Sequence, residues 1–403
     1  MEQENSAEDR DAPRERLLPF DKRWLRADAV AGLIAAAVVI PKAMAFATIA
    51  GLPVQIGLYT VLVPMVIYAV LGTSRPLSVS TTTTIAILSA AALGEAAPNA
   101  STAELAVGAA TLAVIVGAML VLASLLRLGF VANFISEPVL TGFKSGIGFV
   151  IVVDQIPKLL GIHIDKTGFL RDIVQIGEHL PQTSLVALAL SVGILVLIFG
   201  LERFAPRAPA PLIAVAAGIA VCWLLDLQSA GIQTVGSVPR GLPSWVWPQL
   251  GLVEGLWPAA VGIALMSFTE SIAAGRAFAA PDEPRPRANR ELLALGLANV
   301  GGGLFGAMPA GGGTTQTAVN RSAGARTQFA ELVTAAGALA TLLLLAPLIA
   351  LMPNAVLAAV VVVYSVPLIK PEEFRAIARV RKTEFYWAAS ACLGVILLGT
   401  LRG

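Results

Sequence analysis

The stretch Pro309-Ala310-Gly311-Gly312-Gly313-Thr314-Thr315-Gln316-Thr317 decides the fold, and it lies between two strongly apolar segments. A proline and three consecutive glycines cannot continue a membrane helix, because they remove a backbone donor and all side-chain packing. Hydroxyl and amide side chains follow directly, which predicts that a short helix begins there. Such a helix presents unpaired N–H groups and the positive end of its dipole at membrane depth. The stretch therefore predicts one half of an anion-binding site.

The composition is that of a membrane protein. Hydrophobic residues make up 56% of the 403 residues and charged residues 13%, against roughly 25% charged in a soluble domain. The mean hydropathy is +0.78. Apolar runs of membrane length recur along the chain, which predicts an all-α polytopic membrane protein. The net charge of +2 indicates no nucleic-acid partner. Cys222 and Cys392 lie in apolar segments and are interpreted as buried thiols rather than a disulfide framework.

Charge places the predicted spans across the bilayer. Residues 1–27 carry many arginines and are predicted to be a cytoplasmic segment rather than a signal peptide. The first span is expected to be interrupted at Pro41, and Lys144 is expected at a membrane interface. The residues 157–182 are interpreted as a polar external loop and 370–382 as an amphipathic interfacial helix. The thirteen predicted apolar segments are 28–48, 53–71, a short piece ending near 93, 105–126, 134–153, 184–200, 208–226, 258–280, 291–307, 314–322, 327–350, 353–369 and 386–401.

The two halves of the chain contain similar interruptions. Gly72, Pro76 and Thr81-Thr82 are spaced like Gly306, Pro309 and Thr314-Thr315. A charged residue precedes each interruption at a similar distance: Lys42 comes before the first and Glu270 before the second. Paired interrupted segments at matching places in two halves are the best sequence indication of a transporter's binding site. The alternative is that the interruptions are ordinary helix breaks with local caps, which Ser and Thr also provide.

Several motifs resemble one family. The segments Ile-Pro-Lys-Ala-Met-Ala-Phe-Ala at 40–47, Ala-Gly-Leu-Pro-Val-Gln-Ile-Gly-Leu-Tyr at 50–59 and Asp-Gln-Ile-Pro-Lys-Leu-Leu-Gly at 154–161 are similar to those of the sulfate permease (SulP, solute carrier 26) anion transporters. The motif Ile-Ser-Glu-Pro-Val-Leu-Thr-Gly-Phe at 135–143 and the glycine-rich stretch match that family too. The resemblance covers nearly the whole chain.

The resemblance implies a seven-plus-seven inverted repeat, like that of uracil permeases, in which two half-helices meet at mid-membrane. It implies a transmembrane transport domain over 28–401, with a core (28–127 and 256–350) and a gate (130–226 and 353–401). Substrate is then expected between the two half-helix starts. The implied substrate-binding residues there are Ser80, Thr81, Thr82, Thr83, Gly312, Gly313, Thr314 and Thr315. The family also leads us to expect a fourteenth span, a cytoplasmic STAS domain and a homodimer, so this chain is expected to be a truncated form.

Three positions depart from the family pattern. Lys42 stands where the family usually has Gln, and Phe46 stands where it has Tyr. Gln316 occupies a position at which some animal members carry a basic residue. Lys42, Phe46 and Gln316 are therefore added to the predicted substrate site, with the cation supplied by Lys42. A charged side chain at this depth costs about 2.5–3.5 kcal/mol on insertion scales, so Lys42 requires a partner or water. The alternative is a structural ion pair between Lys42 and Glu270.

Glu270 is the candidate coupling residue. A carboxyl group in a low-dielectric site favours its protonated form, and such groups often form proton relays. The resulting hypothesis is proton-coupled symport of a small dianion across a bacterial plasma membrane. The dianion is either a dicarboxylate, such as fumarate, or sulfate. The other transporter hypotheses are sodium-coupled bicarbonate uptake, with Ser267, Thr269 and Ser271 as candidate sodium ligands, and an anion channel of the same architecture. No spacing of His, Asp or Cys predicts an enzyme, a metal site or a cofactor.

Overall fold

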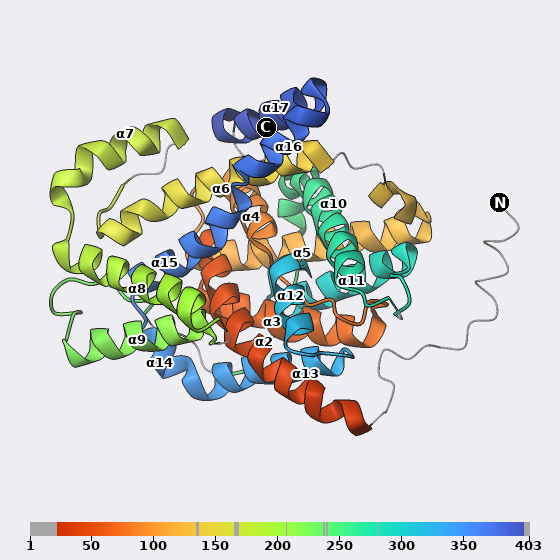
Figure 1. The fold of residues 1–403 in the computed structure, drawn as a ribbon, viewed down its shortest axis with the longest axis horizontal. Helices are drawn as coiled ribbons and strands as arrows, with labels where there is room; N and C mark the ends of the chain where they lie inside the picture. Colours follow the sequence, from red (N-terminus) through yellow and green to blue (C-terminus); the bar gives the residue numbers. More distant parts are fainter. Residues whose placement is uncertain are drawn as a thin grey trace, which may run out of the picture.

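The structure is a computed structural model, and it describes residues 22–133, 137–164, 169–206, 208–236, 238, 241–281 and 283–398. Most of the predicted N-terminal segment (1–21), part of the 135–143 motif and the end of the last predicted span (399–401) lie outside the described residues. Figure 1 shows a bundle made of helices, and seven of the described helices are long and apolar enough to cross a membrane. The prediction of an all-α polytopic fold is confirmed.

The first half of the chain contains one of the two short strands. Its elements are α2 (Lys22–Ile49), α3 (Val54–Leu71), β1 (Val79–Ser80), α4 (Thr83–Ala96), α5 (Thr102–Leu125), η1 (Leu128–Asn133), α6 (Glu137–Leu160), α7 (Phe169–His179), η2 (Leu180–Gln182), α8 (Leu185–Phe204) and α9 (Ala210–Leu224).

The second half contains the other strand. Its elements are η3 (Leu250–Leu252), α10 (Val253–Ala277), α11 (Ala288–Leu304), β2 (Gly311–Gly312), α12 (Thr314–Ser322), α13 (Phe329–Ala340), the π-helical turn η4 (Thr341–Leu345), α14 (Ala346–Ala350), α15 (Asn354–Ser365), η5 (Val366–Leu368), α16 (Pro371–Val380) and α17 (Lys382–Leu398).

Most predicted spans correspond to helices, and the short helix predicted at 314–322 coincides with α12. Two details of the prediction are wrong. The helix α2 is continuous through Pro41, because membrane helices tolerate an internal proline whose lost bond is compensated by their surroundings. The segment 157–182 is not only a loop, since it contains the end of α6 and the amphipathic helix α7.

Two packing groups are visible in the bundle. The first, called the α5–α11 group, consists of α2, α3, α4, α5, α10, α11, α12 and α13. Glycines bring α5 and α11 close together: a Cβ added at Gly303 would lie 2.6 Å from the carbonyl oxygen of Ala110. The glycine run 301–303 therefore serves helix packing. The second, called the α6–α15 group, consists of α6, α8, α9, α15 and α17, and its apolar cluster also includes residues of α2 and α3 such as Met44 and Leu58. Figure 1 places α8 and α9 on the left and α10 and α11 on the right.

The two interruptions meet each other directly. The strands β1 and β2 pair antiparallel, with Val79 opposite Gly312 and Ser80 opposite Gly311. Both glycines press against α10, since added Cβ atoms would lie 3.0 Å and 2.8 Å from the Cα atoms of Ser267 and Ser271. Only glycine permits this approach, so the glycine-rich stretch is explained by the packing of β2 on α10.

Candidate functional site

The site is built on the starts of two short helices. The helix α4 begins at Thr83 after β1, and α12 begins at Thr314 directly after β2. Because β1 and β2 pair, the two helix starts are held beside the same two-stranded ladder. The first N–H groups of each helix have no acceptor within the helix. No side chain caps α12, whose N-cap residue is Gly313. The start of α12 thus has no side-chain cap, whereas at α4 the N-cap residue Thr82 accepts from the N–H of Ile85, as the alternative of a local cap predicts.

The start of α4 is in contact with a carboxylate from α10. The hydroxyl groups of Thr82 and Thr84 donate to the two oxygens of Glu270, at 2.9 and 3.0 Å. Thr82 Oγ1 also accepts from the backbone N–H of Ile85, 3.3 Å away. Glu270 is 6% exposed, so an internal anion lies at the positive end of the α4 dipole. The structure brings together two predicted residues, Thr82 and Glu270. The second hydroxyl donor to Glu270 is Thr84, which was not predicted, whereas the predicted Thr83 has no described bond to Glu270.

The cation beside Glu270 comes from an unexpected helix. The Nζ atom of Lys144, on α6, lies 3.3 Å from Oε1 of Glu270. This contact with a buried carboxylate was not predicted for Lys144, which was expected at a membrane interface. The alternative of a Lys42–Glu270 ion pair is wrong, because the described ion-pair partner of Glu270 is Lys144. The sequence could not predict this contact, because the two residues lie far apart in the chain and are brought together by the packing of α6 beside α4.

Lys42 is buried in an aromatic environment. Its side chain, on α2, is 3% exposed, and its Nζ atom lies 4.1 Å from the ring centroid of Tyr364 on α15. The second ring is that of Phe46, one helical turn away, at 5.7 Å. Aromatic faces attract cations, by up to about 2 kcal/mol when desolvated. Lys42 thus lies beside Phe46, the other predicted site residue of α2, and its nearer aromatic partner is Tyr364.

Gln316 links the two interruptions. Its Oε1 accepts from the Ser80 hydroxyl at 2.9 Å, and its Nε2 donates to the carbonyl oxygen of Thr81 at 3.2 Å. The hydroxyl of Thr81 is buried and has no hydrogen-bond partner among the described residues. Buried polar groups are nearly always paired, so this hydroxyl is a candidate ligand group. Thr314 and Thr315, at the start of α12, are exposed.

Three side chains hold β2 and the residue before it in place; Ser267 and Ser271 were considered only as sodium ligands, and Asn299 was not predicted. Ser267 donates to the carbonyl oxygen of Ala310 at 2.7 Å, and the hydroxyl of Ser271 accepts from the N–H of Gly312 at 2.7 Å. Asn299, on α11, accepts from the N–H of Ala310 at 2.8 Å and donates back to its carbonyl at 3.0 Å. The signal was present in the sequence: Ser267 and Ser271 are four residues apart, on one face of an apolar helix. These residues satisfy the backbone groups that the glycine-rich stretch leaves unpaired.

Glu291 is a second buried carboxyl group, and its role is structural. Its oxygens accept from the Tyr68 hydroxyl at 2.8 Å and from the N–H and hydroxyl of Thr73. These contacts tie α11 to the end of α3 and to the chain just before β1. Glu291 therefore anchors the first interruption.

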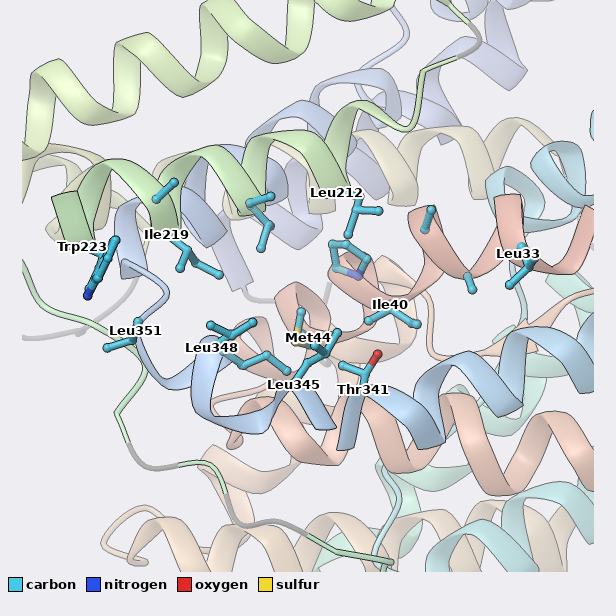
Figure 2. Close-up of a pocket in the computed structure, with 17 residues that line it drawn as sticks. Leu33, Ile40, Met44, Leu212, Ile219, Trp223, Thr341, Leu345, Leu348 and Leu351 are labelled. Carbon is cyan, nitrogen blue, oxygen red and sulfur yellow. The ribbon is translucent and has the colours of Figure 1, made fainter. Parts of the chain in front are cut away.

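An apolar pocket of about 670 Å³ lies away from these polar groups. Figure 2 shows Leu33 and Met44 of α2, Leu212 of α9 and Leu348 of α14 around it. The hydroxyl of Thr341, also in its wall, donates to the carbonyl oxygen of Gly337 at 2.9 Å. Apart from Thr341 and Trp223, the lining is apolar, so the better candidate for an anion site is the polar one between α4 and α12. Among the described residues no group of His, Cys, Asp or Glu could hold a metal ion.

Fold and site together define the class: a polytopic helical membrane protein with two interrupted segments that meet among buried polar side chains. Comparison with known proteins gives the family. The sequence profile of the Sulfate permease family matches residues 25–391. The "Probable sulfate transporter Rv1739c" of Mycobacterium tuberculosis is 36% identical over 386 residues, covering 95% of this chain and 69% of the relative. Solute carrier family 26 member 6 of Homo sapiens is 30% identical over 363 residues, covering 84% and 48%. The chain belongs to the sulfate permease family, and the relatives named above are transporters and not enzymes.

Solved structures agree on the fold. SLC26A9 superposes with a TM-score of 0.89 at 24% identity, over 94% of this chain and 63% of that one. The transmembrane domain of the cyanobacterial bicarbonate transporter BicA superposes with a TM-score of 0.86 at 22% identity, over 94% and 97%. The chain therefore has the fold of a membrane anion transporter of this family, and the prediction of an integral multi-pass membrane protein is confirmed.

Proposed function

We propose that the chain is a secondary active anion transporter that carries a small dianion together with a proton. The observation that supports this most strongly is the place of Glu270, whose carboxylate lies at the start of α4 and accepts from Thr82 and Thr84. An anion at the same helix start would meet a like charge at short range, which is strongly unfavourable in a poorly hydrated site. A proton on Glu270 removes that repulsion, so proton and anion bind together.

The substrate anion is proposed to bind between the two helix starts. The N–H groups of the first turns of α4 and α12 suit carboxylate or sulfate oxygens. The buried hydroxyl of Thr81 and the exposed hydroxyls of Thr314 and Thr315 supply further donors. Ser80 and Gln316 hold the two sides at a fixed separation through their mutual hydrogen bond.

Lys42 is proposed to favour dianions over monoanions. Its described contacts are two aromatic rings, so the described residues leave its charge without a carboxylate partner. A second negative charge on the substrate balances that charge at short range. The proposed substrates are dicarboxylates such as fumarate, and sulfate, the anion named for the mycobacterial relative.

Transport is proposed to proceed by alternating access. The α5–α11 group contains both helix starts and corresponds to the predicted core, whereas the α6–α15 group corresponds to the predicted gate. Rigid movement of one group against the other would expose the anion to each side in turn. We further propose a cytoplasmic N-terminus and a homodimer for the complete protein.

A substrate screen in proteoliposomes tests the proposal. Uptake of labelled sulfate, fumarate and bicarbonate is measured under imposed proton and sodium gradients, with the wild type and Lys42→Gln. We expect uptake of a dianion that responds to the proton gradient and not to sodium. Lys42→Gln should reduce the preference for divalent over monovalent anions. Uptake that requires sodium, or unchanged selectivity in the variant, would contradict the corresponding part of the proposal.

A further inference from the structure

Lys144 is a second cation near the proposed anion site, in addition to Lys42, and it is the one that pairs with Glu270. We propose that Lys144 is the counter-charge of the transported anion, and that it exchanges between Glu270 and the substrate during the cycle. This inference rests on the proposed function, since it assigns a second partner to the cation beside the coupling carboxylate. It makes Lys144 a residue that determines substrate charge preference.

The geometry allows the exchange. Nζ of Lys144 lies 3.3 Å from Oε1 of Glu270, and the same oxygen accepts from Thr84 in the first turn of α4. Lys144 and the first turn of α4 therefore contact the same carboxylate oxygen, so the ammonium group lies close to the helix start at which the anion is proposed to bind. Its side chain is 28% exposed while that of Glu270 is 7% exposed. Lys144 is thus the more accessible partner and can turn toward an incoming anion.

Among the described residues, the other groups bonded to Glu270 are neutral. Hydroxyl groups at the start of α4 donate to its carboxylate. On α10, Ser267, one turn before Glu270, bonds to Ala310, and Ser271, the next residue, bonds to Gly312 of β2 and to its own helix. Gln316 of α12 is neutral and bonded to the first interruption. Among the described residues, the ion-pair partner of Glu270 is Lys144. Once Glu270 takes a proton, the attraction between the two side chains is lost and Lys144 needs another anion.

Lys144 belongs to the other packing group. Its helix lies tightly on α17, since a Cβ added at Gly142 would lie 2.0 Å from the carbonyl oxygen of Ala388, and it also packs on α15 and α8. Toward the α5–α11 group α6 contacts α4. The ion pair therefore joins the two packing groups at the site itself. If Lys144 leaves Glu270 and pairs with the substrate, the two packing groups are then joined through the bound anion instead of through Glu270.

Equilibrium binding of labelled sulfate to the purified full chain in detergent tests the exchange at neutral pH. In Glu270→Gln, Lys144 is free, and we expect sulfate to bind at least as tightly as to the wild type. Adding Lys144→Met to that variant should weaken sulfate binding about tenfold, as expected for the loss of one close charge pair. Because both charges are absent in the double variant, no buried charge is left unpaired and the fold should be retained.

Two controls separate a charge effect from a structural one. Lys144→Arg combined with Glu270→Gln should restore sulfate binding, and the loss in the Met variant should be larger for sulfate than for nitrate, since a monovalent ion gains less from the cation. Equal losses for both ions, or double-variant binding equal to that of Glu270→Gln, would overturn the inference while leaving the proposed function intact. Absence of sulfate and fumarate binding in the wild type and in Glu270→Gln would contradict both.

Discussion

Glu270 is the residue on which the proposed transport chemistry depends. Three donors from two other helices surround its carboxylate: the hydroxyls of Thr82 and Thr84, and the ammonium group of Lys144. Hydrogen bonds to a charged group contribute more than bonds between neutral groups, about 1.5–3 kcal/mol each. The contacts hold the carboxylate at the start of α4, where its charge state decides whether a second anion can bind.

Thr84→Val tests this arrangement at the residue scale. The substitution keeps the shape of the side chain and removes one donor to Glu270, so we expect a loss of about 1–3 kcal/mol in stability and reduced proton-driven uptake. The matched control is Ser89→Ala, because Ser89 lies on the same helix and its buried hydroxyl has no partner among the described residues. Thermal unfolding in detergent and uptake in proteoliposomes are the measurements. Equal behaviour of the two variants would contradict the assigned role of Thr84.

At the scale of elements, the ladder of β1 and β2 holds the two short helices together. Its backbone groups are satisfied by Ser267, Ser271 and Asn299 as well as by the strands themselves. Gly311 and Gly312 could not be replaced by larger residues without pushing β2 away from α10. The positions of both helix starts therefore follow from how closely the glycines approach that helix.

Gly312→Ala tests the close approach. The added Cβ would lie 2.8 Å from the Cα atom of Ser271, so we expect a destabilisation of about 1–3 kcal/mol, typical of overpacking. The control is Gly262→Ala on α10, where an added Cβ meets nothing within 4 Å. That substitution should be neutral or stabilise the helix by up to about 1 kcal/mol. Unfolding temperatures in detergent compare the two, and an unchanged value for Gly312→Ala would refute the packing argument.

The sequence was sufficient for the spans and for the two helix starts, because long apolar runs and glycine-proline interruptions are local signals. The strand ladder has no such signal, since two-residue strands are too short to show an alternating pattern. The partner of Glu270 is also invisible locally: sequence spacing identifies neighbours on one helix, whereas Lys144 approaches from a different one. The predicted interruption at Pro41 is wrong for a related reason, because the effect of a proline on a membrane helix depends on the helices around it.

At the scale of the whole molecule, two cationic contacts join the packing groups. Lys42 of α2 contacts the ring of Tyr364 on α15, and Lys144 of α6 contacts Glu270 on α10. Each contact places a lysine of one group against a side chain of the other. Movement of one group against the other must change both contacts, so the proposed alternating access and the charge state of the site are coupled.

The most direct measurement of the central claim is uptake by Glu270→Gln under an imposed proton gradient. Reconstituted wild type and variant are compared in net uptake of the labelled dianion and in exchange between labelled and unlabelled substrate. Because glutamine carries no charge and takes no proton, we expect exchange to persist while proton-driven accumulation is lost. Accumulation in the variant that still follows the imposed proton gradient would contradict the coupling role of Glu270.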